Sequence, residues 1–148
     1  ATYEKFGCSY WAPNAAVWPP NFGKPQSVWS IGQSYGALWR NFNGIDQLAS
    51  VISTIRNDPK SRRLIVTAWC PGAEACLPSC HILFQFYVRD GKLTCGVYMR
   101  SVDMCVGLPS DIVMYALLTN LIAKDTGLIA SELVFFLMDC HVYENQIF

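Results

Sequence analysis

The sequence is poor in charged residues and has no surplus of either sign. Only 15% of its 148 residues are charged, and 11 basic side chains are matched by 11 acidic ones. Proteins that bind nucleic acid through its phosphates need clustered positive charge, so this class is excluded and a phosphate-bearing ligand would need a local group of arginines. The longest apolar stretch, residues 112–123, is interrupted by Thr119 and Asn120 and is too short to span a bilayer.

A secretion signal is absent as well, and histidine is scarce. No signal-peptide pattern opens the chain, so we expect a cytoplasmic protein, in the host cytoplasm if a phage encodes it. The two histidines, His81 and His141, have no second pair of ligands at short spacing, and no metal is expected. Cysteine is not scarce, but an odd number of seven without a secretion signal favours reduced thiols over disulfides.

Apolar side chains are abundant. They make up 52% of the chain, which excludes intrinsic disorder and suffices for one hydrophobic core, so we expect a single domain. Apolar periodicity predicts an amphipathic helix over residues 45–56 and a long helix over residues 112–126, with Ser110 or Asp111 as its N-cap and Gly127 at its end. Because apolar residues cover almost every face of the long helix, we expect it to be central and buried.

Runs rich in β-branched and aromatic residues predict four strands, the first of them buried: residues 63–69, 81–88, 93–100 and 133–137. Asp90-Gly91 predicts a hairpin turn between the second and third strands. Residues 139–145 are predicted to form a polar turn, and residues 1–34 a loop anchored by Trp11, Trp18 and Trp29. Strands mixed with helices indicate an α+β domain, with a mixed β-sheet packed against a long central buried helix.

Polar side chains gather in four short segments where the pattern predicts burial or a turn: residues 61–63, 77–81, 100–103 and 139–143. A thiol close to several guanidinium groups ionises at neutral pH and becomes nucleophilic. Three arginines and a serine hydroxyl can hold a phosphate with bidentate hydrogen bonds. Taken singly, a cysteine usually acts as a small apolar residue, and an arginine pair usually lies on a solvated surface. Found together, they favour a site with a nucleophilic thiol and a bound phosphate.

In their order and spacing these segments resemble the thymidylate synthase family, to which the phage deoxycytidylate hydroxymethylases are close relatives. The resemblance runs from about Tyr35 to Asn145. Its motifs are Tyr-Gly-Ala-Leu-Trp-Arg at residues 35–40, the paired-arginine segment at 58–69, Leu-Pro-Ser-Cys-His-Ile-Leu-Phe-Gln-Phe-Tyr-Val at 77–88, Arg100-Ser101-x-Asp103, and His141-x-Tyr143.

The resemblance implies a thymidylate-synthase-like fold and a one-carbon transfer from 5,10-methylenetetrahydrofolate to C5 of a pyrimidine deoxynucleoside monophosphate. Cys80 would add to C6 of the base, and Tyr35 and His81 would order waters and proton transfers near C5. Arg100 and Ser101 would bind the phosphate and favour the thiolate of Cys80.

Further residues would contact the ligands or come from a second subunit. His141 and Tyr143 would bind the sugar 3′-hydroxyl, Asp103 would line the nucleotide site and contact the pterin, and Gly107 would contact the folate. Arg62 and Arg63 would reach the phosphate from the partner subunit of a homodimer. The ligands implied are therefore the nucleotide and the folate, with neither nucleic acid nor a membrane as partner.

Asp111 departs from the synthases, which have an asparagine facing the base. A carboxyl group that carries a proton matches cytosine, because it donates to N3 and accepts from the C4 amino group. Met99, where the synthases usually have Gln, also matches the hydroxymethylases. We therefore expect a dCMP hydroxymethylase that prefers dCMP to dUMP. The alternatives are a thymidylate synthase that methylates dUMP, a non-catalytic nucleotide-binding remnant, and, for Asp111 itself, a mere helix cap.

Other departures have no clear meaning. Met138 replaces a family Gly, Gln146 replaces a His, and Ser131-Glu132 stands in place of Gly-Glu. The family's N-terminal folate-binding glutamate and arginine loop, and its C-terminal tail, have no counterpart in the sequence. We therefore expect residues 1–148 to be one catalytic domain in a fragment that lacks both family termini.

Overall fold

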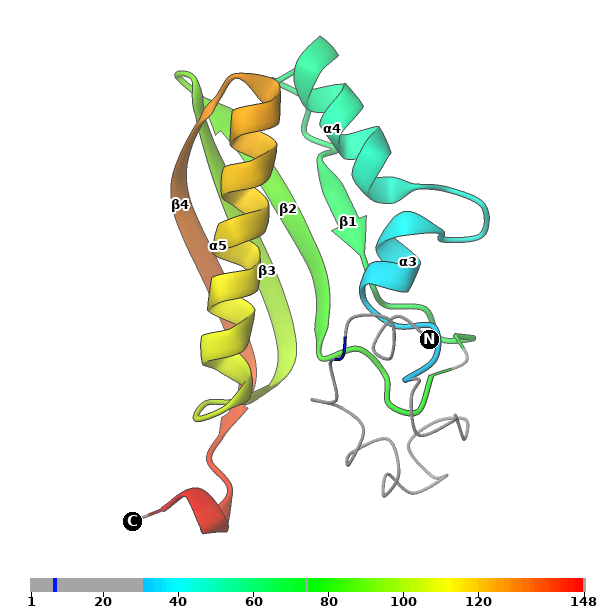
Figure 1. Ribbon diagram of the computed structural model, residues 1–148, viewed down its shortest axis with the longest axis vertical. Helices are drawn as coiled ribbons and strands as arrows, with labels where there is room; N and C mark the ends of the chain where they lie inside the picture. Colours follow the sequence, from blue (N-terminus) through cyan, green and yellow to red (C-terminus); the bar gives the residue numbers. More distant parts are fainter. Residues whose placement is uncertain (1–6, 8–30, 74, 148) are drawn as a thin grey trace.

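The computed structural model describes Gly7 and residues 31–73 and 75–147 (Figure 1). The three predicted anchors Trp11, Trp18 and Trp29 lie outside these residues, as does most of the predicted loop. The described residues form one four-stranded sheet, and the helices pack against the same face of it (Figure 1).

The sheet has the strand order β1-β2-β3-β4. β1 (Ile65–Thr67), β2 (His81–Arg89) and β3 (Lys92–Asp103) are successively antiparallel, whereas β4 (Ile129–His141) is parallel to β3. The parallel pair is connected by the helix α5 (Gly107–Thr126), as such a crossover requires. The predicted α+β class with a mixed sheet is confirmed.

The turn between β2 and β3 has the geometry that its two residues favour. Asp90 and Gly91 have φ values of 51° and 72°, and two positive φ values in a two-residue connection match the right-handed twist of the flanking strands. Asp and Gly tolerate this conformation better than other residues do, so the hairpin prediction is confirmed.

The strand boundaries differ from those predicted. β1 is shorter than residues 63–69 and is buried on one face only: Val66 is fully buried, whereas Ile65 is 44% exposed. β3 and β4 are longer than predicted because they pair along their whole length, with Ser101 opposite Asp139 and Asp103 opposite His141. Residues 139–141 therefore belong to a strand and not to a turn.

Two of the helices begin at other residues than expected. α4 (Gln47–Asn57) starts after Asp46, whose side chain accepts a hydrogen bond from the Ala49 N–H at 2.9 Å. α5 starts at Gly107, its N-cap Val106 has no capping side chain, and Ser110 and Asp111 lie inside the helix. The prediction that either residue is the N-cap was wrong.

Pro109 explains the error, because Gly-Leu-Pro is typical of a loop. Proline is nevertheless tolerated in the first helical turn, where its missing N–H would have no intrahelical partner. The other end of α5 is as predicted, since Gly127 has a φ of 73° and closes the helix in the left-handed conformation.

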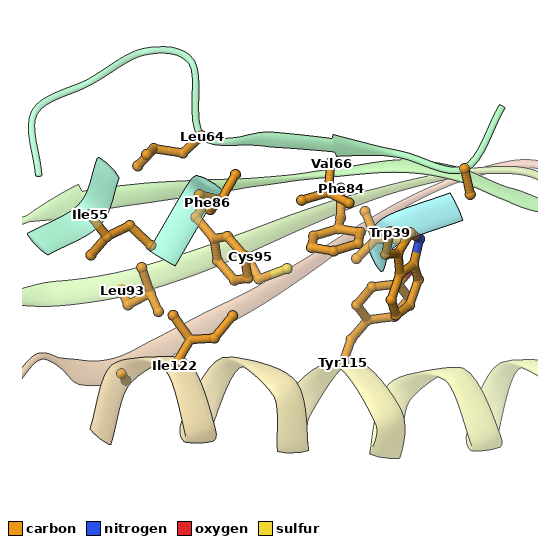
Figure 2. Close-up of a cluster of buried hydrophobic side chains, with 14 of the residues drawn as sticks. Trp39, Ile55, Leu64, Val66, Phe84, Phe86, Leu93, Cys95, Tyr115 and Ile122 are labelled. Carbon is orange, nitrogen blue, oxygen red and sulfur yellow. The ribbon is translucent and has the colours of Figure 1, made fainter. Parts of the chain in front are cut away.

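The core lies between the sheet and the helices (Figure 2). Phe84 and Phe86 of β2 and Tyr115 of α5 are its largest fully buried side chains, and Trp39 of α3 (Gly36–Arg40) packs edge-on against Phe84. α5 is buried on this face alone, whereas its outward residues, Val113, Leu117 and Leu121 among them, are exposed. None of the described helices is long and apolar enough to cross a membrane.

This topology brings four chain segments to one end of the sheet. β2 starts where β3 ends, because the two strands are antiparallel, and β4 ends there as well, because it is parallel to β3. α5 starts directly after β3 at the same end, the lower one in Figure 1. The predicted site segments at residues 77–81, 100–103 and 139–143 therefore meet.

Candidate active site

Arg100 holds the loop that carries Cys80. Its Nε donates to the carbonyl oxygen of Ser79 at 2.9 Å, and its Nη2 donates to that of Pro78 at 2.7 Å. Nη2 also lies 4.0 Å from the Cys80 Sγ. The structure thus places the positive charge of Arg100 beside the half-buried thiol of Cys80.

Two further contacts stabilise this loop and its arginine. The ring of Trp69 lies 5.9 Å from the Arg100 guanidinium carbon, within the range of a cation–π interaction. The buried hydroxyl of Ser79 lies 3.2 Å from that of Ser34. A loop fixed at both its carbonyl groups and its hydroxyl can present Cys80 in one position.

Tyr35 contacts both residues of the Cys80-His81 pair. Its hydroxyl accepts a hydrogen bond from the Cys80 N–H at 3.0 Å, and its ring stacks on that of His81 at 4.0 Å. Tyr35 has a φ of 44°, a conformation that costs a non-glycine residue about 1–3 kcal/mol and that gathers at functional sites. Burial raises the pKa of the Tyr35 hydroxyl, which therefore keeps its proton.

A bulge turns His81 toward the helices. The register of β2 against β3 shifts between His81 and Leu83, so that His81 and Phe84 are both buried although they are three residues apart. Nδ1 of His81 lies 2.6 Å from the hydroxyl of Tyr115 on α5. Burial lowers the pKa of His81 to about 3, so its imidazole is neutral at physiological pH.

Asp111 of α5 is the third polar residue of this cluster, after Tyr35 and His81. Its Oδ1 lies 3.7 Å from the His81 Nε2, beyond hydrogen-bonding distance, and because the imidazole is neutral the two do not form an ion pair. Burial raises the pKa of Asp111 to about 6. The carboxyl group thus exchanges its proton close to neutral pH, as general acids and bases in active sites do.

Tyr115 was not predicted as a site residue, because it was taken as part of an apolar helix. It stands four residues after Asp111, and residues at this spacing share one face of a helix. Burial raises the pKa of its hydroxyl. The spacing from Asp111 is the signal that could have identified it.

A second group of predicted residues lies where β3 and β4 end. Asp103 pairs with His141 across the two strands, and its Oδ1 accepts hydrogen bonds from the Cys105 and Val106 N–H groups at 3.0 and 3.3 Å. A side chain at Gly107 would contact the Asp103 Cβ at 3.5 Å. Asp103 therefore fixes the turn into α5 and stands beside Gly107.

The sugar-binding residues predicted at the end of β4 are more exposed. The rings of His141 and Tyr143 meet edge-on at 5.1 Å, and the His141 Nδ1 lies 3.4 Å from the Asp139 Oδ1. Ser101, the predicted phosphate ligand, pairs with Asp139 on the neighbouring strand. All of these residues lie at the same end of the sheet as Cys80.

Arg62 and Arg63 are not brought to this end. β1 pairs with β2 so that Ile65 faces Gln85, and continuing this register places Arg63 level with Tyr87, seven residues beyond Cys80. At about 3.3 Å per residue this is about 23 Å. Both arginines are exposed, and they cannot contact a ligand that is bound to Cys80 of the same chain.

Comparisons with known proteins identify the family of the chain. The family model "Thymidylate synthase" matches residues 2–148. The thymidylate synthase of Mycoplasma pneumoniae is 47% identical over 124 residues, which cover 82% of this chain and 43% of that protein. Thymidylate synthase 1/2 of Encephalitozoon cuniculi is 42% identical over 160 residues, covering 97% of this chain and 54% of that protein. The chain thus spans about half the length of these relatives, and it belongs to the thymidylate synthase family.

Proposed function

We propose that the protein transfers a one-carbon unit from methylenetetrahydrofolate to C5 of a pyrimidine deoxynucleoside monophosphate, by way of a covalent adduct between Cys80 and C6. The observation that carries this proposal is the position of the Cys80 thiol, 4.0 Å from the Arg100 guanidinium and one residue from the buried His81. Both relatives are named thymidylate synthases, which supports methylation of dUMP, the alternative above, better than hydroxymethylation of dCMP.

Each side chain of the site has a distinct role in this proposal. The Cys80 thiolate adds to C6 and makes C5 nucleophilic, while Arg100 and Ser101 hold the phosphate. Tyr35 and neutral His81 are uncharged near pH 7, so they orient water and move protons near C5 without placing a charge in the pocket. Asp111 faces the base, His141 and Tyr143 bind the sugar, and Asp103 and Gly107 contact the folate.

The first test is tritium release from C5 of labelled dUMP and dCMP in the presence of methylenetetrahydrofolate. We expect release from dUMP with formation of dihydrofolate, because methyl formation takes a hydride from the folate, whereas hydroxymethyl formation takes a water. Release from dCMP without dihydrofolate would favour the hydroxymethylase, for which Asp111 is the supporting observation. Release from neither nucleotide would leave a non-catalytic nucleotide-binding protein.

A homodimer is part of the proposal, and two observations support it. Arg62 and Arg63 lie too far from Cys80 of their own chain to share its ligand. The sheet face that the helices leave open carries exposed apolar side chains on at least three strands, which are Ile65, Tyr87, Val134, Phe136 and Met138. Exposed apolar patches of this kind mark interfaces. A second copy that packs on this face would supply its own Arg62 and Arg63 to the phosphate of the first copy's ligand.

Subunit mixing tests the shared site. A Cys80→Ser protein and an Arg62→Ala, Arg63→Ala double variant should each be inactive, but after subunit exchange about a quarter of wild-type activity should return, because half of the dimers are hybrids and each hybrid has one intact site. Tritium release before and after exchange is the measurement. Absence of rescue, with hybrids verified by mass spectrometry, would favour a site built within one chain.

A further inference from the structure

The side chain of Gln146 makes hydrogen bonds in two directions. It belongs to η2 (Glu144–Gln146), the short 3₁₀ turn that follows β4 and is drawn red in Figure 1. Its Nε2 donates to both carboxylate oxygens of Asp103, at 3.2 and 3.3 Å, and its Oε1 accepts from the Tyr143 N–H at 2.9 Å. It is half-buried, whereas its neighbours Glu144 and Asn145 are exposed.

These contacts need both a donor and an acceptor on one side chain. The Asp103 carboxylate accepts only, and the Tyr143 N–H donates only, so a carboxamide satisfies both groups. Glutamate at position 146 keeps the acceptor for Tyr143 but offers Asp103 no donor while it is ionised. Leucine has a similar size and can satisfy neither group.

The bonded groups belong to the two halves of the proposed ligand site. Asp103 is the residue proposed to contact the pterin, and Tyr143 is proposed to bind the sugar. The contacts from Gln146 span 43 residues of sequence to Asp103 and three to Tyr143. One side chain therefore connects the end of β3 with the segment that follows β4.

We propose that Gln146 is a positioning residue that orients Asp103 for the folate and, through its backbone, Tyr143 for the nucleotide. This inference rests on the proposed function, because it takes the roles of Asp103 and Tyr143 from there. Gln146 contacts neither ligand in this account and acts through these two residues alone.

Two substitutions separate the halves of this role. Gln146→Glu should raise the KM for methylenetetrahydrofolate by about tenfold or more, since a carboxylate then faces Asp103, and should change the Kd for dUMP by less than about twofold. Gln146→Leu loses both contacts and should raise both constants by about threefold to tenfold. Glu144→Gln, a change of the same size in the same turn that does not touch Asp103, is the matched control and should alter neither.

The measurements are steady-state kinetics for the folate and calorimetric titration with dUMP, with melting temperatures and hydrogen exchange of the Tyr143 amide alongside. The Tyr143 amide should exchange faster in Gln146→Leu than in Gln146→Glu, which a uniform loss of stability would not produce. The inference is wrong, while the proposed function stands, if Gln146→Glu raises the dUMP Kd as much as it raises the folate KM. It is also wrong if neither Gln146 variant changes these constants more than Glu144→Gln does. A wild-type protein that binds neither ligand overturns both.

Discussion

Replacing Cys80 by serine should lower the rate of tritium release from C5 by several orders of magnitude, because a serine hydroxyl without an activating base is a far weaker nucleophile than a thiolate beside a guanidinium group. Nucleotide binding should change much less, since Arg100 and Ser101, the proposed phosphate ligands, are untouched. Single-turnover kinetics and dUMP titration on the same variant separate the two effects.

The control for this variant is Cys105→Ser. The Cys105 thiol is exposed and lies outside the loop that carries Cys80, so this variant should keep most of the activity. Cys95 is a poorer control. It is fully buried between the sheet and the helices, and burial raises the pKa of its thiol to about 12, so a polar hydroxyl there would disturb the core. A Cys80→Ser protein with full activity would contradict the covalent mechanism.

Local sequence signals predicted those parts of the fold that depend on short stretches of chain. The Asp90-Gly91 turn and the closing Gly127 are where residue type fixes a backbone conformation, and both were placed correctly. The amphipathic helix over 45–56 was found with a shift of two residues at its start, because Ile45 fits the apolar period but lies before the Asp46 cap. The six cysteines within the described residues have free thiols.

The parts that were wrong depend on contacts between distant segments. The extension of β3 and β4 follows from their parallel pairing, which brings Asp103 opposite His141 across 38 residues and leaves no mark in either local pattern. The N-cap prediction at Ser110 or Asp111 failed for a local reason instead, since Gly107 to Ser110 already form the first turn of the helix.

The candidate site divides in the same way. Its motifs predicted Cys80, Arg100 and His81. The structure adds that Arg100 donates to the carbonyl oxygens of Pro78 and Ser79 and that His81 contacts the hydroxyl of Tyr115. The partners of Asp103 and His81 come from 43 and 34 residues away, so neither Gln146 nor Tyr115 could be assigned before the topology was known.

Asp111→Asn should change the choice between the two nucleotides. Asp111 lies inside α5 and not at its cap, which excludes the mere helix cap considered from the sequence, and we propose that its carboxyl group faces the base. An ionised carboxylate faces the O4 of uracil acceptor to acceptor, whereas an amide donates to O4 and accepts from N3–H. A mismatch of this kind costs about 1–3 kcal/mol. At pH 8 the variant should therefore raise the ratio of kcat/KM for dUMP to that for dCMP by about tenfold to a hundredfold.

The pH dependence gives the same substitution a second readout. Burial raises the pKa of Asp111 to about 6, so the carboxyl group is neutral below that pH and ionised above it. Only the neutral form can donate to O4, and the wild-type kcat/KM for dUMP should fall as the pH rises from 6 to 8. Asparagine is uncharged throughout, so this fall should be absent in Asp111→Asn, while Ser110→Ala, the neighbouring exposed position, should keep the wild-type profile. An unchanged nucleotide ratio together with an unchanged pH profile in Asp111→Asn would mean that Asp111 does not face the base, and the choice of pyrimidine would then have to be made elsewhere in the pocket.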